Sequence, residues 1–202
     1  HAVYGHPSEA LSLIAITGTN GKTTISQCLA RAYPKPCAII GTLGAGFPDA
    51  LTETGFTTPE ATTLMRYLAQ FRARHAAACA LEASSIGIEE GRMNGARVDV
   101  AVFTNFTRDH LDYHKTFENY LKAKKAFFDN LPKQAFALTN LDDKNGTVMT
   151  QNTKAKVAAY SLHSLCDFKG KVLEDSFDGM LLDINNREVN VQFIGRFNAS
   201  NL

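Results

Sequence analysis

The chain has 202 residues, of which 45% are hydrophobic, and its formal net charge at pH 7 is +1. A chain of this length and composition can bury a full core as one domain, and no stretch resembles a low-complexity linker. The near-zero charge argues against sequence-independent binding to nucleic acid, which needs a field of clustered lysine and arginine. Any anionic ligand must therefore be held by local groups.

The cysteines and the apolar runs indicate the compartment. The four cysteines form no C-x-x-C pair, and three of them lie in apolar runs where a reduced thiol packs well. The longest apolar run, residues 76–81, is too short to cross a bilayer. The first residues lack a basic-then-apolar leader pattern. We expect a cytoplasmic protein without a membrane or nucleic-acid partner.

Strands and helices alternate along most of the chain. Residues 11–17 are typical of a buried strand, and residues 24–32 have the apolar spacing of a helix. Further strands are predicted at residues 37–43, 76–81, 98–104 and 135–139, with helical patterns between the later ones. This alternation predicts an α/β fold with a doubly wound, mostly parallel sheet.

Two further segments complete the predicted order. A glycine-rich loop follows residue 43, and Thr58 as N-cap with Pro59 in the first turn is predicted to open a helix. Residues 180–184 and 189–194 alternate in polarity around a turn-rich tripeptide, which predicts a small C-terminal β-hairpin appendix.

The chain begins at His1 and ends in a pattern that opens a helix. We therefore expect residues 1–202 to be one domain excised from a longer protein.

Residues 17–24 read T-G-T-N-G-K-T-T between the first strand and the first helix. In such a loop the glycines let backbone amides point at an anion, Lys22 adds a point charge, and the Thr23 hydroxyl can ligate Mg²⁺. The spacing is shorter than that of the common G-x-x-x-x-G-K-[ST] loop. An ordinary strand-to-helix turn would have no use for the lysine, so we interpret the segment as a phosphate-binding loop.

Glu82 directly follows the strand predicted at residues 76–81. Ligands of open α/β sheets bind beyond the carboxyl ends of the strands, so a carboxylate here can provide a second Mg²⁺ ligand opposite the phosphate loop. The alternative is an acidic residue that only stabilises a helix N-terminus.

Lys124 falls on the apolar stripe of a predicted helix, four residues after Tyr120 and three before Phe127. It can extend its ammonium to water, which is the common behaviour of such a lysine. Alternatively, a desolvated amine can react with CO₂ to give a carbamate, an oxygen ligand for a hard metal. His110 follows Asp109 at a predicted helix start, and a lone histidine is more often structural than a ligand.

Together these features resemble the central ATP-binding domain of the Mur ligases. Within that family the chain is most similar to the ligases that add the third residue of the peptidoglycan stem peptide. The similarity extends over essentially the whole chain. The most specific matching segments are residues 17–24, 57–61, 81–85, 103–114 and 195–201.

The resemblance implies an ATP-dependent amide ligation through an acyl phosphate, with two Mg²⁺ sites. The substrates would be UDP-N-acetylmuramoyl-L-alanyl-D-glutamate and a diamino acid such as diaminopimelate or lysine. It also implies that Lys22 holds the β- and γ-phosphates. The first Mg²⁺ would be held by Thr23 and Glu82, and the second by His110 and carbamylated Lys124. The implied nucleotide-binding residues are Gly18, Thr19, Asn20, Gly21, Lys22, Thr23, Thr24, Asn198 and Asn201, and the implied contacts to the muramoyl peptide are Thr57, Thr58, Ser84 and Arg92.

One position departs from the family pattern. Relatives often carry a histidine where this chain has Ile86, and we assign that position no role. A folylpolyglutamate synthase has a similar fold and loop and is the alternative enzyme. A second alternative is that the 202 residues alone are a nucleotide-binding module without ligase activity. We expect a monomer.

Overall fold

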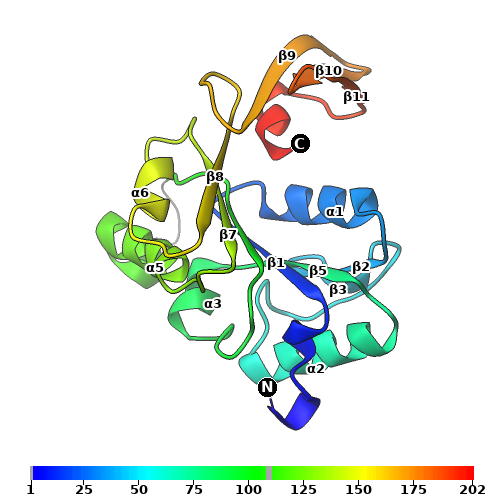
Figure 1. Cartoon of the computed structure of the whole chain (residues 1–202), viewed down its shortest axis with the longest axis vertical. Helices are drawn as coiled ribbons and strands as arrows, with labels where there is room; N and C mark the ends of the chain where they lie inside the picture. Colours follow the sequence, from blue (N-terminus) through cyan, green and yellow to red (C-terminus); the bar gives the residue numbers. More distant parts are fainter. Residues whose placement is uncertain (1, 108–110) are drawn as a thin grey trace.

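The computed structural model describes residues 2–107 and 111–202, so His110 lies outside the described residues. Within them, eleven strands form one sheet in the order β11-β10-β9-β8-β7-β6-β1-β5-β2-β3-β4, with helices on both faces (Figure 1). The strands are β1 (Ser12–Thr17), β2 (Cys37–Gly41), β3 (Gly44–Phe47), β4 (Ala50–Thr52), β5 (Ala78–Glu82), β6 (Val100–Phe103), β7 (Phe136–Asn140), β8 (Lys156–Ser161), β9 (Phe168–Ser176), β10 (Gly179–Ile184) and β11 (Glu188–Val191).

The helices connect the parallel strands. The α-helices are α1 (Lys22–Ala32), α2 (Ala61–Ala73), α3 (Ser85–Glu89), α4 (Leu111–His114), α5 (Phe117–Asp129) and α6 (Gly146–Thr150), and the 3₁₀ helices are η1 (Ala2–Tyr4), η2 (Pro7–Glu9) and η3 (Arg196–Asn201). None of the helices in the described parts of the chain has the length and apolar character that crossing a bilayer requires.

The centre of the sheet is parallel, as predicted. Strands β2, β5, β1, β6, β7 and β8 pair in parallel with one another in this order, and β9 continues this direction for two residue pairs. The strands at both edges are antiparallel. The carboxyl ends of β1, β2, β5 and β6 therefore meet at one edge of the sheet, where the polar residues predicted from the sequence follow them.

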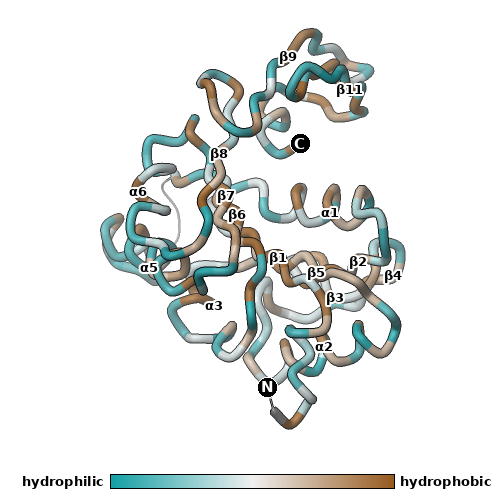
Figure 2. Tube along the Cα trace, viewed as in Figure 1, coloured by the Kyte–Doolittle hydropathy of each residue, from teal (hydrophilic) through white to brown (hydrophobic). Residues whose placement is uncertain are grey.

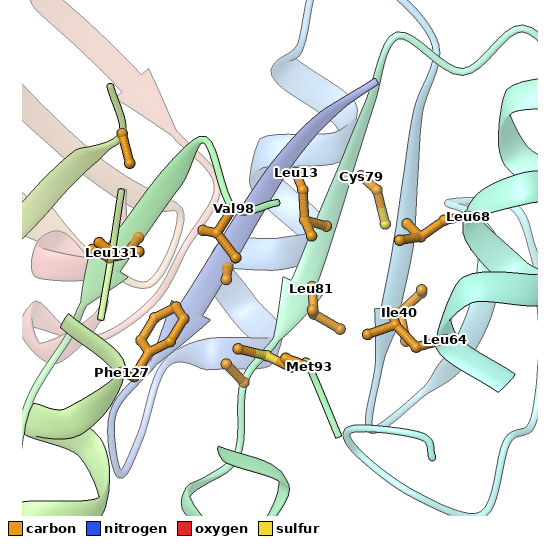
Figure 3. Packing of buried hydrophobic residues seen from close by; sticks show 14 of the residues in the cluster. Leu13, Ile40, Leu64, Leu68, Cys79, Leu81, Met93, Val98, Phe127 and Leu131 are labelled. Carbon is orange, nitrogen blue, oxygen red and sulfur yellow. The ribbon is translucent and has the colours of Figure 1, made fainter. Parts of the chain in front are cut away.

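The central strand β1 is buried on both faces, which explains its unbroken apolar sequence. Leu13 and Ala15 pack in a cluster that contains side chains of α2 and α5. Ile14 and Ile16 face the other way, into a cluster with α1. Figure 3 shows the first cluster, in which Leu13 lies among side chains of the neighbouring strands and helices. Each such fully buried aliphatic side chain stabilises the fold by about 1.5–3 kcal/mol.

Three sequence predictions need correction. Helix α2 begins at Ala61 with Glu60 as N-cap, not at Pro59, because the Thr58 hydroxyl is used elsewhere in the fold. The glycine-rich loop after residue 43 contains two short edge strands, β3 and β4. The C-terminal appendix is a three-stranded meander, since β9 pairs with the predicted hairpin of β10 and β11.

The appendix has a small cluster of its own. Met180 and Leu182 of β10 pack with Ala199 of η3, so the end of the chain returns to the meander. Figure 2 shows the hydrophobic stretches concentrated in the central strands, while the outer loops are mostly hydrophilic. The chain therefore has a main two-faced core, and the appendix extends from one edge of the sheet (Figure 1).

Candidate active site

The phosphate loop connects β1 to α1 and requires glycine at two positions. Gly18 and Gly21 have φ of 153° and 87°, in the region that favours glycine. A Cβ at Gly18 would lie 1.8 Å from Thr104 Oγ1, and one at Gly21 would lie 2.3 Å from Asn201 Oδ1. Helix α1 begins at Lys22, so its first amides have no acceptor within the helix. The loop therefore directs backbone donors toward an anion at the helix N-terminus.

The segment after β6 supports this loop. The backbone amides of Thr19 and Asn20 each donate to Asn105, to its backbone carbonyl and its side-chain oxygen respectively, both at 2.9 Å. In return, the Thr104 hydroxyl donates to the Asn20 carbonyl at 2.6 Å. The Thr107 amide donates to Thr19 Oγ1 at 2.9 Å. These bonds fix the loop conformation from a neighbouring strand.

Two lysines converge on one carbonyl of the loop. Lys22 Nζ donates to the carbonyl oxygens of Gly18 and Thr19 at 2.9 and 2.8 Å. Lys124 Nζ reaches the same Gly18 oxygen at 3.1 Å and lies 4.9 Å from the ring centre of Tyr120. Lys124 is 1% exposed, which excludes the alternative that its ammonium extends to bulk water. An interior amine at this position fits the functional interpretation from the sequence.

Glu82, at the end of β5, is a buried carboxylate with neutral partners. It is 1% exposed and accepts hydrogen bonds from the Thr23 hydroxyl at 3.0 Å and from the Thr42 hydroxyl and amide at 3.0 and 3.2 Å. Among the described residues, no ion pair to Glu82 is present. Buried carboxylates are normally paired with a cation or bound to a metal. The site thus has the hard oxygen ligands that suit Mg²⁺.

A second group of polar residues follows β5 and precedes α2. The buried Thr58 hydroxyl donates to the Glu82 carbonyl at 2.7 Å and accepts from the Ser84 amide at 3.0 Å. Ser84 is also the N-cap of α3, where its hydroxyl accepts from the Gly87 amide at 3.0 Å. These bonds place the segment that carries Thr57 and Thr58 beside the Mg²⁺-ligand candidate.

Arg92 is fixed by several partners in the same region. Its guanidinium donates to the Thr58 carbonyl at 2.8 Å and to the Glu90 carboxylate at 2.7 Å. Its carbon Cζ lies 4.9 Å from the ring centre of Phe56. The Arg92 side chain is 11% exposed, so it is not the solvated loop arginine that is more common. Its planar fork is oriented before a ligand arrives.

These residues surround one cavity of about 590 Å³. The predicted site residues that line it are Thr19, Asn20, Gly21, Lys22, Thr23, Thr24, Thr57, Thr58, Glu82, Ser84, Arg92 and Lys124. Asn201 lies against Gly21 and donates to Asn198 at 3.2 Å, so this pair borders the phosphate loop from the side of α1. The placement of His110 stays a prediction.

Sequence reasoning missed several residues of the site. Thr42 donates to Glu82, and Phe56 and Ser85 line the cavity. Thr42 lies within the strand predicted at residues 37–43, and directly follows β2 in the structure, so the sequence contained no signal for its role. Ser85 lies within a matching segment but has no predicted role of its own, because its side-chain partner His114 is distant in sequence.

Comparisons with known proteins show the family of this chain. Residues 16–202 match the family model described as the Mur ligase middle domain. The chain belongs to this family. The sequence prediction of a Mur ligase middle domain is therefore confirmed.

The curated relatives of this Mur ligase middle domain include two named UDP-N-acetylmuramoyl-L-alanyl-D-glutamate--2,6-diaminopimelate ligase. The relative from Phocaeicola vulgatus is 58% identical, and the relative from Bacteroides fragilis is 55% identical. Each alignment covers 98% of this chain and 42% of the relative. The chain thus spans about two fifths of the length of these relatives.

Solved structures show the same fold. A UDP-N-acetylmuramoyl-L-alanyl-D-glutamate--2,6-diaminopimelate ligase is 36% identical, with a TM-score of 0.84 over 95% of this chain and 41% of the other. A folylpolyglutamate synthase from Mycobacterium tuberculosis is 17% identical, with a TM-score of 0.70 over 99% of this chain and 54% of the other. The second likeness shows the fold alone.

Proposed function

We propose that this chain is the ATP-binding middle domain of a longer ligase that joins 2,6-diaminopimelate to UDP-N-acetylmuramoyl-L-alanyl-D-glutamate in peptidoglycan biosynthesis. The observation that carries this proposal is the single cavity in which the phosphate loop, Glu82, Lys124 and Arg92 meet. The names of the most similar relatives support the choice of substrates. The 17% identity to a folylpolyglutamate synthase gives that alternative no comparable support.

The phosphate loop supplies the nucleotide site. The first amides of α1 donate to the phosphates, and Lys22 exchanges its bonds to the Gly18 and Thr19 carbonyls for bonds to the β- and γ-phosphates. The adenine nucleotide lies against Asn198 and Asn201, which border Gly21. This arrangement directs the γ-phosphate into the cavity toward the muramoyl-peptide residues.

Two Mg²⁺ ions complete the site. Thr23 and Glu82 would hold the first, because their oxygens lie 3.0 Å apart. His110 and Lys124 would hold the second, the lysine as a carbamate formed when its neutral amine binds CO₂ and releases a proton. When bound, the metal ions neutralise the crowded phosphate and carboxylate oxygens.

The ligation proceeds in two steps. A carboxylate of the D-glutamate residue attacks the γ-phosphorus, the bond to the β-phosphate oxygen breaks, and an acyl phosphate and ADP form. The amine of diaminopimelate then attacks the acyl carbon, and phosphate leaves from the tetrahedral intermediate while the amine loses a proton. Thr57, Thr58, Ser84 and Arg92 hold the muramoyl peptide so that the carboxylate faces the γ-phosphate.

The ligase works as a monomer in the cytoplasm, where ATP is available. Its four free cysteines fit a reducing compartment. The net charge of +1 does not favour a nucleic-acid partner.

A ligation assay on the full-length ligase tests this function. The enzyme receives ATP and Mg²⁺ with one acceptor at a time, either the UDP-muramoyl dipeptide or a folate, and with diaminopimelate, lysine or glutamate as the amine. Mass spectrometry should detect the diaminopimelate-containing UDP-muramoyl tripeptide. Turnover of folate with glutamate, and none of the UDP-muramoyl dipeptide, would contradict the proposal.

The isolated 202-residue chain provides a second measurement. We expect weak ATP–Mg²⁺ binding by calorimetry and no amide product, because such sites are usually assembled by closure of neighbouring domains. Product formation by this chain alone would show that no other domain is needed.

A further inference from the structure

His114 holds both ends of the short helix α3. The imidazole lies at the end of α4, and its side chain is fully buried. Its Nε2 lies 2.9 Å from Ser85 Oγ, and its Nδ1 lies 2.9 Å from the Glu89 carboxylate. Ser85 and Glu89 are the first and last residues of α3. The Nε2 contact to Ser85 is a hydrogen bond, and the Nδ1 contact to Glu89 is an ion pair when the imidazole is protonated.

The same ring also supports the phosphate side of the cavity. The His114 and Tyr120 rings stack at 5.1 Å with an interplanar angle of 29°. Tyr120 is fully buried, and its hydroxyl lies 3.1 Å from Thr19 Oγ1 in the phosphate loop. The Tyr120 ring centre is 4.9 Å from Lys124 Nζ. His114 therefore lies directly behind the side chain that contacts both the loop and the buried lysine.

The helix that His114 holds belongs to the muramoyl-peptide side. Ser85 lines the cavity and follows Ser84, whose amide donates to Thr58 Oγ1 at 3.0 Å. A displacement of α3 would thus displace Ser84 and Thr58, while a displacement of Tyr120 would disturb Lys124 and Thr19. The buried His114 imidazole contacts both α3 and Tyr120, and so connects the two sets of residues.

We propose that His114 is a positioning residue, whose two ring nitrogens and ring face together align the muramoyl-peptide side of the cavity with its phosphate side. This inference rests on the proposed function. A buried polar ring needs partners for both nitrogens, and here they come from the two ends of one helix. At position 114, an apolar ring could keep the stack with Tyr120 but not the contacts with α3. An amide side chain could keep one polar contact but not the stack.

The test compares variants of the full-length ligase. His114→Phe keeps the ring stack and removes the hydrogen bond to Ser85 and the ion-pair contact with Glu89, and His114→Gln keeps a polar group without the ring. His163→Phe is the matched control, because His163 is exposed in the loop after β8. We expect kcat to fall about 10- to 100-fold in both His114 variants, because a shift near 1 Å in the reacting groups has an effect of that size. The KM for ATP should stay within about threefold, since loop amides bind the phosphates.

A pH profile separates positioning from proton transfer. We expect the kcat profile of His114→Phe to keep the shape of the parent profile at a lower level. Loss of one limb of the profile would mean that His114 transfers a proton, and the positioning role would be wrong. An unchanged kcat in a folded His114→Phe ligase would also overturn it.

A second set of variants covers the case in which His114→Phe does not fold. The double variant Ser85→Ala with Glu89→Gln keeps the imidazole and weakens both of its bonds to α3. We expect at least a fivefold loss of kcat, with thermal unfolding close to that of the parent, and parental kcat would overturn the inference. An inactive parent ligase would instead refute the proposed function, so the two failures are distinguishable.

Discussion

Substitution of Gly41 by alanine should disturb the cation site without changing any of its ligands. Gly41 is the buried last residue of β2, and its φ lies outside the region that requires glycine. An added Cβ would lie 2.1 Å from Glu82 Oε1 and 2.5 Å from Glu82 Cδ. The carboxylate must therefore move away from the hydroxyls of Thr23 and Thr42.

The size of the effect follows from packing and lost hydrogen bonds. Overpacking a buried site costs about 1–3 kcal/mol. Each hydrogen bond that the displaced carboxylate loses adds about 1 kcal/mol. We expect a total of about 2–4 kcal/mol, which lowers the Tm of a domain of this size by about 4–16 °C. The Mg²⁺ concentration for half-maximal ligation should rise about tenfold or more, because the ligand is misaligned.

Thermal unfolding and a Mg²⁺ titration of ligase activity measure these effects. Gly170→Ala is the matched control, because its added Cβ meets only the flexible end of Leu162, at 2.9 Å, far from the site. If Gly41→Ala and Gly170→Ala have the same Tm and the same Mg²⁺ dependence, Glu82 does not occupy the position that we describe.

Three further predictions concern the lysine, the asparagine and a thiol. Lys124→Ala should lower ligase activity at least about 100-fold, and added short-chain carboxylates should restore part of it; an alanine variant as active as the parent refutes the carbamate. Asn201→Ala should raise the KM for ATP about tenfold at similar kcat in steady-state assays, and an unchanged KM would remove it from the nucleotide site. Burial raises the pKa of the Cys37 thiol to about 11, so the folded state keeps its proton where the unfolded state has lost it. Stability should therefore decline between about pH 9 and pH 11 in chemical unfolding, more than in Cys37→Ala; equal pH dependence in the two proteins would contradict this.

The sequence predicted the centre of the sheet because burial on both faces requires unbroken apolar runs. Strands β1, β5, β6 and β7 each lie within one residue or two of the predicted ranges. Strands β3, β4, β8 and β9 were not predicted. The glycine-rich or polar segments among them become strands only through pairing with a neighbour. The start of α2 was misplaced because the Thr58 hydroxyl bonds to Glu82 and Ser84 instead of a helix amide.

Some residues of the site could likewise be predicted from the sequence, and others only from the fold. The phosphate loop was predictable because its glycines, lysine and threonines are consecutive in the chain. Helical periodicity placed Lys124 on the apolar stripe of its helix, but only the fold showed that its amine is buried. The contacts of Glu82 with Thr42 and of Ser85 with His114 join positions that are 40 and 29 residues apart. Local spacing contains no signal for such pairs, so only the fold could bring them together.

The most direct measurement is a crystal structure of the full-length ligase with a non-hydrolysable ATP analogue and Mg²⁺. We expect the triphosphate between Gly18 and Thr24, with a cation in contact with the Thr23 hydroxyl and the Glu82 carboxylate. A triphosphate bound elsewhere, or a Glu82 that remains hydrogen-bonded to Thr42 with no cation beside it, would contradict the proposed site.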